Sequence, residues 1–110
     1  MIVQPAPRRP MFCGFVSAIA VLALPFAARA ADAGHGEVMA KRWCAFCHIV
    51  SSEQKTGSTQ APPFSAIAKM PAFDAGKVAF YLLSPHPQMA DIGLTRSDAA
   101  DLAAYIAQQK

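Results

Sequence analysis

The 110-residue sequence predicts an all-α protein in which about four short helices surround one small core. Apolar residues recur at helical spacing in several segments of residues 37–107, which indicates amphipathic helices. No segment alternates apolar and polar residues as a half-buried strand does. The part that is expected to fold has only about 80 residues, so a core of polypeptide alone would be small.

The first thirty residues have the pattern of a secretory signal. Arg8-Arg9 precedes an apolar run over residues 11–28, and Ala28-Arg29-Ala30 places small residues where signal peptidase cleaves. We therefore expect residues 1–30 to be removed, leaving 31–110 as the mature domain. The alternative is a retained membrane anchor, which Pro25 disfavours because it interrupts a straight helix through the bilayer.

The charge is unevenly distributed along the chain. Three of the ten Lys and Arg residues, Arg8, Arg9 and Arg29, belong to the first thirty residues, whereas all seven Asp and Glu residues follow residue 30. The domain at 31–110 is therefore close to neutral. Its composition gives no indication of nucleic-acid binding.

The mature domain is expected to begin with a polar lead-in at residues 31–36, in which His35 is solvated and not a ligand. Apolar spacing predicts a helix over residues 37–44. We expect Trp43 in this helix to pack beside the last helix or beside the macrocycle that the next residues predict, because a large indole is rarely left exposed.

At the end of this helix stands Cys44-Ala45-Phe46-Cys47-His48, the spacing used for covalent haem attachment. Each thiol can add to one vinyl group of the porphyrin, and a gap of two residues allows one turn of chain to reach both. The histidine that follows the second thioether is then held under the iron, where it can be the proximal ligand. The motif predicts haem c bound through Cys44 and Cys47, with His48 on the iron. A buried macrocycle would also supply apolar surface that so short a chain lacks.

Two other chemistries use the same cysteine spacing. A redox-active dithiol is expected beside a strand, and no convincing strand is visible in this chain. A structural zinc site needs four nitrogen or sulfur ligands, whereas the only other cysteine, Cys13, lies in the predicted signal.

Downstream of the motif, residues 51–60 are predicted to form a surface loop. Ala61-Pro62-Pro63-Phe64 follows, and it is either a plain stiff turn or a segment whose carbonyl accepts the second N–H of the proximal imidazole.

Three further helices are predicted. One covers residues 64–70 and is stopped by Pro71, and the second covers residues 75–84, with Asp74 as its N-cap. Thr95 begins the last helix, with Asp98 as its capping-box partner. The apolar face of the second helix is Val78, Tyr81 and Leu82, and the buried stripe of the last one is Ala99, Leu102, Tyr105 and Ile106.

The sixth iron ligand has several candidates. Met39 precedes the motif too closely to reach the opposite haem face, and Met70 is expected to be a core residue. Met89 lies in a loop far enough along the chain to cross the haem, with a helix after it. His86, between two prolines, competes with Met89. Met89 is favoured on these grounds.

The chain resembles the class I c-type cytochromes, specifically small bacterial periplasmic ones. The resemblance covers residues 34–110 and rests on Gly36, Cys44-Ala45-Phe46-Cys47-His48, Ala61-Pro62-Pro63-Phe64, the segment from Leu83 to Met89, and the ending at 101–106. It implies four short helices wrapped around one haem c, with thioethers at Cys44 and Cys47. It also implies iron ligation by His48 and Met89, a hydrogen bond from His48 to the Pro62 carbonyl, and close packing of Gly36 against the last helix near Tyr105.

The expected function is electron transfer in the periplasm by a carrier that is not an enzyme. Two iron ligands from the protein leave no open site, so the haem changes its charge without exchanging ligands. The expected partners are redox proteins, with no nucleic acid and no stable membrane insertion once the signal is removed. Two alternatives stay open: a haem subunit of a larger dehydrogenase or oxidase, and a haem protein whose open sixth position binds small ligands.

Overall fold

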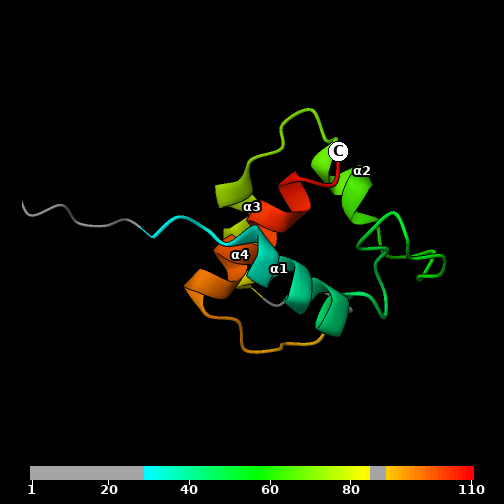
Figure 1. Ribbon diagram of the computed structural model, residues 1–110, viewed down its shortest axis with the longest axis horizontal. Coiled ribbons are helices and arrows are strands. Elements are labelled where there is room, and N and C mark those ends of the chain that lie inside the picture. Colours follow the sequence, from blue (N-terminus) through cyan, green and yellow to red (C-terminus); the bar gives the residue numbers. More distant parts are fainter. Residues whose placement is uncertain (1–28, 85–88) are drawn as a thin grey trace, which may run out of the picture.

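The computed structural model describes residues 29–84 and 89–110, and no strand is present in these two ranges. The helical elements in chain order are α1 (Ala33–Met39), a π-helical turn (Ala40–Cys44), α2 (Phe64–Ala68), α3 (Ala75–Leu82) and α4 (Arg96–Ala107) (Figure 1). The predicted all-α fold with four short helices is confirmed.

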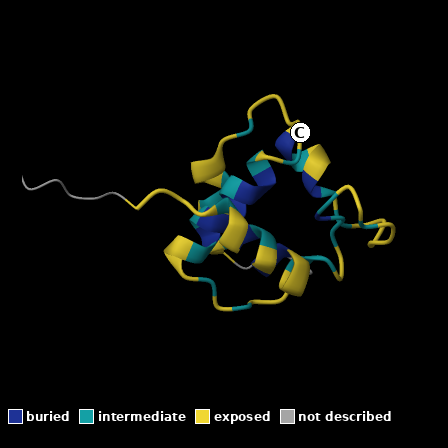
Figure 2. Ribbon diagram, in the orientation of Figure 1, coloured by how far each residue is buried: buried dark blue, intermediate teal, exposed yellow. Residues whose placement is uncertain are grey.

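The last helix, α4, is the centre of the packing, and α1, α2 and α3 all contact it. Its predicted stripe is buried as expected, at Ala99, Leu102, Tyr105 and Ile106. The core continues into the other elements through Met39, Ala40, Val50, Phe64 and Ala68. Figure 2 shows the buried residues gathered on α4 and on the segments that face it. These residues form the core that supports the motif at residues 44–48.

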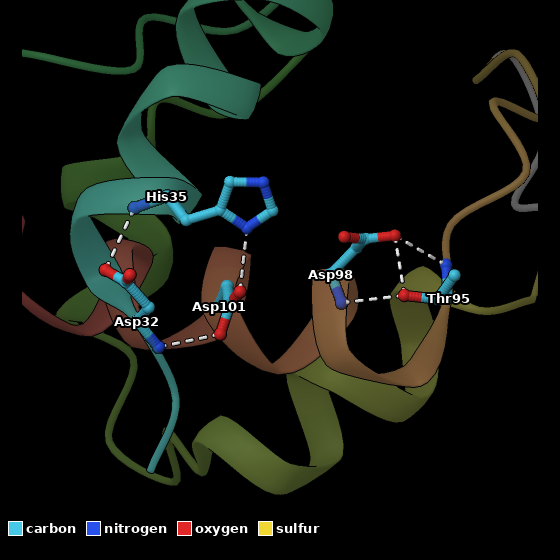
Figure 3. Close-up of polar contacts among 5 residues, drawn as sticks. All are labelled: Asp32, His35, Thr95, Asp98 and Asp101. Carbon is cyan, nitrogen blue, oxygen red and sulfur yellow. Dashed lines mark hydrogen bonds and ion pairs between the residues drawn. The ribbon is translucent and has the colours of Figure 1, made fainter. Parts of the chain in front are cut away.

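The first helix begins four residues earlier than the sequence pattern predicts, at Ala33 instead of Glu37. Asp32 is its N-cap, and the carboxylate of Asp32 accepts the backbone N–H of His35 at 3.0 Å. The expectation of a polar lead-in is wrong, because residues 33–36 belong to α1. His35 is exposed to solvent as expected, but its ring is also held, through a bond of 2.8 Å from Nδ1 to Oδ2 of the buried Asp101 (Figure 3).

Gly36 permits the close crossing of α1 and α4. A Cβ at this position would lie 2.1 Å from the carbonyl oxygen of Asp101, which is far inside van der Waals contact. The close packing implied by the resemblance is therefore present. It occurs about one turn before Tyr105 on the last helix.

The helix predicted over residues 37–44 changes its hydrogen-bonding pattern halfway. Residues 40–44 form a π-helical turn, closed by a bond of 3.0 Å from the Ala45 N–H to the Ala40 carbonyl. Trp43 in this turn is 52% exposed, with the Arg42 guanidinium 4.8 Å from the centre of its ring. The polypeptide therefore leaves about half of Trp43 uncovered, and packing of its indole beside the macrocycle stays a prediction.

The remaining helices begin where the sequence predicts. Asp74 caps α3 through the Lys77 N–H, and Thr95 and Asp98 form the complete capping box of α4 (Figure 3). In α3, Val78 and Leu82 are half-buried, but Tyr81 is 56% exposed. Met70, predicted to be a core residue, is 54% exposed and lies beyond α2, which ends at Ala68.

Among residues 29–84 and 89–110, no helix has the length and apolar character that a bilayer span requires. The predicted signal, apart from Arg29 and Ala30, and the ligand candidate His86 lie outside these described ranges.

Candidate functional site

The attachment motif forms one tight turn directly after the π-helical segment. The carbonyl of Cys44 accepts the N–H of Cys47 at 3.1 Å and the N–H of His48 at 2.9 Å. The two sulfurs and the imidazole therefore belong to a single turn of chain. Both cysteines are free thiols, Cys44 half-buried and Cys47 exposed.

The two thiols differ in their surroundings. Burial raises the pKa of the Cys44 thiol to about 11, so Cys44 is protonated at neutral pH. Cys47, one turn further, is exposed to solvent. The pair therefore presents one thiol on the surface and one at the edge of the core, where Cys44 packs against the buried cluster.

The His48 ring is oriented by the proline segment. Its Nδ1 lies 2.7 Å from the Pro62 carbonyl oxygen, the contact that the resemblance implies. A carbonyl can only accept, so Nδ1 carries the hydrogen and Nε2 carries the lone pair. This is the tautomer in which Nε2 can bind a metal, and the hydrogen bond raises the basicity of the ligand.

Aromatic packing connects His48 to the core. The ring centres of His48 and Phe64 are 5.4 Å apart, and those of Phe64 and Tyr105 are 6.3 Å apart with an edge-on geometry. The Tyr105 hydroxyl donates to the Val50 carbonyl at 2.9 Å. The segment that carries His48 is thus connected to Tyr105 of α4 in two ways, through the ring of Phe64 and through the carbonyl of Val50.

The candidates for a sixth ligand have different surroundings. Met39 is buried in the polypeptide core, and the His35 ring is held by Asp101. Met89 is half-buried at the edge of a cavity of about 300 Å³, which is also lined by the end of α3 and by Leu94. Among the methionines of residues 29–84 and 89–110, Met89 is half-buried and lies outside the core and outside any helix.

The donor set fits haem better than zinc. Among the described residues, no group of three His, Cys, Asp or Glu side chains is close enough to hold a metal ion. Two thiols with an imidazole whose Nδ1 is already bonded match covalent attachment plus axial ligation. The helical fold and this turn together fit the site of a c-type haem protein.

Comparison with known proteins agrees with this class. The chain is 47% identical over 93 residues to cytochrome c-552 of Bradyrhizobium diazoefficiens, in an alignment that covers 84% of this chain and 89% of the relative. No family model and no solved structure matches. The chain belongs to the small c-type cytochromes, and it carries covalently bound haem c and functions in electron transfer.

Sequence reasoning misses one residue beside the motif. Residues 51–60 are predicted to be a plain surface loop, but the side chain of Gln54 turns inward onto the attachment segment. A glutamine in a polar run has no spacing rule that could reveal this role. Only the path of the folded loop brings its amide to the motif.

Proposed function

We propose that the chain is an exported, periplasmic electron carrier whose iron is ligated by His48 and Met89, with thioethers at Cys44 and Cys47. The bound haem supplies the one-electron chemistry, and the protein supplies position and electrostatic tuning. The observation that carries the proposal is the 2.7 Å contact from His48 Nδ1 to the Pro62 carbonyl, within the turn that also holds both thiols.

Pro62 and Phe64 hold the His48 ring in the orientation that this proposal requires. The Pro62 carbonyl fixes the tautomer and strengthens the imidazole as a donor, while Phe64 limits rotation of the ring. A rigid ligand changes its geometry little between two oxidation states. A carrier benefits, because a small rearrangement allows fast electron transfer.

Met89 supports the assignment of a carrier over an enzyme. Its thioether, as a second axial ligand, would close the iron to exogenous molecules and favour the reduced state. Leu82 and Leu94 line the same cavity as Met89 and would keep water from the thioether. If the iron had an open sixth position, the second candidate function would be binding of small ligands.

Export is proposed from the sequence at the start of the mature domain. Arg29 and Ala30 are exposed and non-helical, and the capped helix begins only after Asp32. A peptidase that cleaves after Ala30 would act on accessible backbone and leave α1 complete. Intact-mass analysis of periplasmic protein should show a chain that begins at Ala31 and carries one haem. A chain that retains Met1 would contradict cleavage and favour an anchored cytochrome.

Redox proteins are the partners of a cytochrome of this family, and we propose brief, weak contacts with them. The domain at 31–110 is close to neutral, so contact is expected to depend on a small apolar area more than on long-range charge. The rate of electron transfer should then depend weakly on salt. Stable copurification with a dehydrogenase or oxidase would favour a subunit of a larger complex.

The ligand assignment is tested with a methionine pair. Met89→Ala should remove the weak long-wavelength absorption band of a thioether bound to ferric haem, lower the reduction potential and allow carbon monoxide to bind the ferrous protein. Met70→Ala is the matched control, because Met70 is 54% exposed, and its spectrum should equal that of the wild type. His86→Ala should also keep the band. Rapid carbon monoxide binding by the wild type would refute ligation by Met89 and support the open site.

A further inference from the structure

The main-chain carbonyls of the attachment segment, defined as residues 44–50, are almost fully engaged. Apart from Cys44, whose carbonyl closes the turn, three of them accept from the loop that follows, one from the first residue of α2 and one from α4. The pairs are Ala45 and His48 with Gln54 Nε2, Cys47 with the Ser58 N–H, Ile49 with the Phe64 N–H, and Val50 with the Tyr105 hydroxyl. Each such bond removes the cost of an unsatisfied carbonyl near the core.

Gln54 has the largest part in this arrangement. Its Nε2 lies 2.9 Å from the Ala45 carbonyl, 2.8 Å from that of His48 and 2.7 Å from that of Thr56. Its Oε1 accepts the Val50 N–H at 2.9 Å. The orientation of the amide is unambiguous, because three carbonyls can only accept and a backbone N–H can only donate.

These bonds span the iron ligand. Ala45 lies three positions before His48 and Val50 two positions after it, and Gln54 bonds to both as well as to His48 itself. The Pro62 carbonyl fixes the imidazole ring, whereas Gln54 fixes the backbone from which the ring projects. The two contacts are complementary, because a ring can keep its Nδ1 bond only if its own Cα stays in place.

We propose that Gln54 is the positioning residue for His48. This role rests on the proposed function, in which His48 is an iron ligand, and Gln54 itself touches neither iron nor ring. Loss of its Nε2 donors would free the carbonyls of Ala45 and His48 and let the turn shift. The Nδ1 bond to Pro62 would then open more often while the core around Leu102 stays folded.

The main test is the isosteric change Gln54→Glu, with Gln54→Ala beside it. The carboxylate keeps the shape and the acceptor for Val50 but lacks the two hydrogens that the amide shares among the three carbonyls. In ferrous protein, solvent exchange of the His48 Nδ1 proton, measured by nuclear magnetic resonance against the Leu102 amide proton, should accelerate about tenfold, as expected for one lost hydrogen bond. The haem methyl shifts of the ferric protein, which depend on the imidazole plane, should also change.

Two control variants separate positioning from stability. Thr95→Ala weakens the capping box of α4 and lowers global stability without touching the attachment segment. It should therefore leave the ratio of the exchange rate of the His48 Nδ1 proton to that of the Leu102 amide proton unchanged. Gln60→Ala removes an exposed glutamine of the same loop and should change neither readout. An unchanged ratio and unchanged methyl shifts in Gln54→Glu would overturn the proposal, because Gln54 would then contribute to stability alone.

A measurement on the wild type covers the case in which neither Gln54 variant yields holoprotein. The side-chain amide protons of Gln54 should exchange with solvent at least about ten times more slowly than those of Gln60, which corresponds to one retained hydrogen bond. Equal exchange rates would overturn the proposal. A wild-type spectrum without histidine ligation would instead refute the proposed function, so the two failures are distinguishable.

Discussion

The helices α3 and α4 pack against each other, yet they differ in how far the polypeptide covers them. Six residues of α4 are buried, including Leu102 and Tyr105 at 1% and 5% exposure. None of the residues of α3 is buried, and Phe80 is 73% exposed. Both helices have an N-cap with a side-chain hydrogen bond, so capping does not explain the difference. The difference follows from their neighbours, because α1, α2 and α3 all pack against α4, whereas α3 packs mainly against α4.

The pair α1 and α4 therefore forms the frame of the protein, and α3 lies at its edge. Gly36 brings the two frame helices into backbone contact, and the carboxylate of Asp101 joins them by bonds to Asp32 and His35. The contact of α3 with α4 relies instead on half-buried apolar residues such as Val78 and Leu82. Substitutions in the frame should consequently lower the free energy of unfolding more than substitutions in α3.

The largest effect is expected at the helix crossing. Gly36→Val should prevent formation of folded holoprotein, because a side chain at this position would overlap the Asp101 carbonyl. Circular dichroism and haem staining of the periplasmic fraction would measure it. Gly34→Ala is the matched control in the same helix, since its Cβ would meet only the Asp32 side chain at 3.2 Å. Normal folding of Gly36→Val would mean that the two helices are not in backbone contact.

Leu102→Ala should have the next largest effect. The side chain is 1% exposed and central in the core, so its truncation should lower the free energy of unfolding by about 2–5 kcal/mol. Urea denaturation followed by haem absorbance would give the value. If Leu82→Ala, at a half-buried position of α3, cost as much, the contrast between frame and edge would fail.

Asp101→Asn tests the polar contact between the frame helices. The hydrogen bond with His35, and then the bond from the Asp32 N–H, hold the pKa of the Asp101 carboxyl below its usual value. The ionised form therefore adds stability above about pH 3.9, the unfolded value, and this is lost as pH falls through the lower folded pKa. We expect Asp101→Asn to lose about 1–3 kcal/mol at neutral pH.

The acid limb of the stability curve provides the control for that variant. The wild type should lose stability between the unfolded and the folded pKa of Asp101, whereas Asp101→Asn should show a flatter curve in the same window. Thermal unfolding of both proteins, followed from about pH 6 down to about pH 2, would measure this difference. Parallel curves would show that Asp101 does not titrate with folding.

The smallest effect is expected at the exposed side of α3. Phe80 lies about 200° around the helix from Val78, on the face turned away from α4. Phe80→Ala should change the free energy of unfolding by no more than about 0.5 kcal/mol. Chemical denaturation of the holoprotein would test this value. A loss of the size expected for Leu102→Ala would show that α3 is covered on both faces in the holoprotein.

How much of the site can be predicted depends on how local its parts are. The motif and His48 are visible in the sequence because attachment needs fixed spacing within one turn. The Pro62 contact stays open on residues alone, since it joins positions 14 apart. Gln54 escapes notice because its bonds depend on how a polar loop folds back over the turn.

By itself the sequence determined the all-α fold, the caps at Asp74 and Thr95, and the buried stripe of α4. These features depend on residues within one or two turns of each other, where spacing alone sets the geometry. Only the tertiary structure decided that α1 starts at Ala33 and that His35 is held by Asp101, across 66 positions of sequence. A buried carboxylate from a distant helix supplied the partner, and no local pattern carries that information.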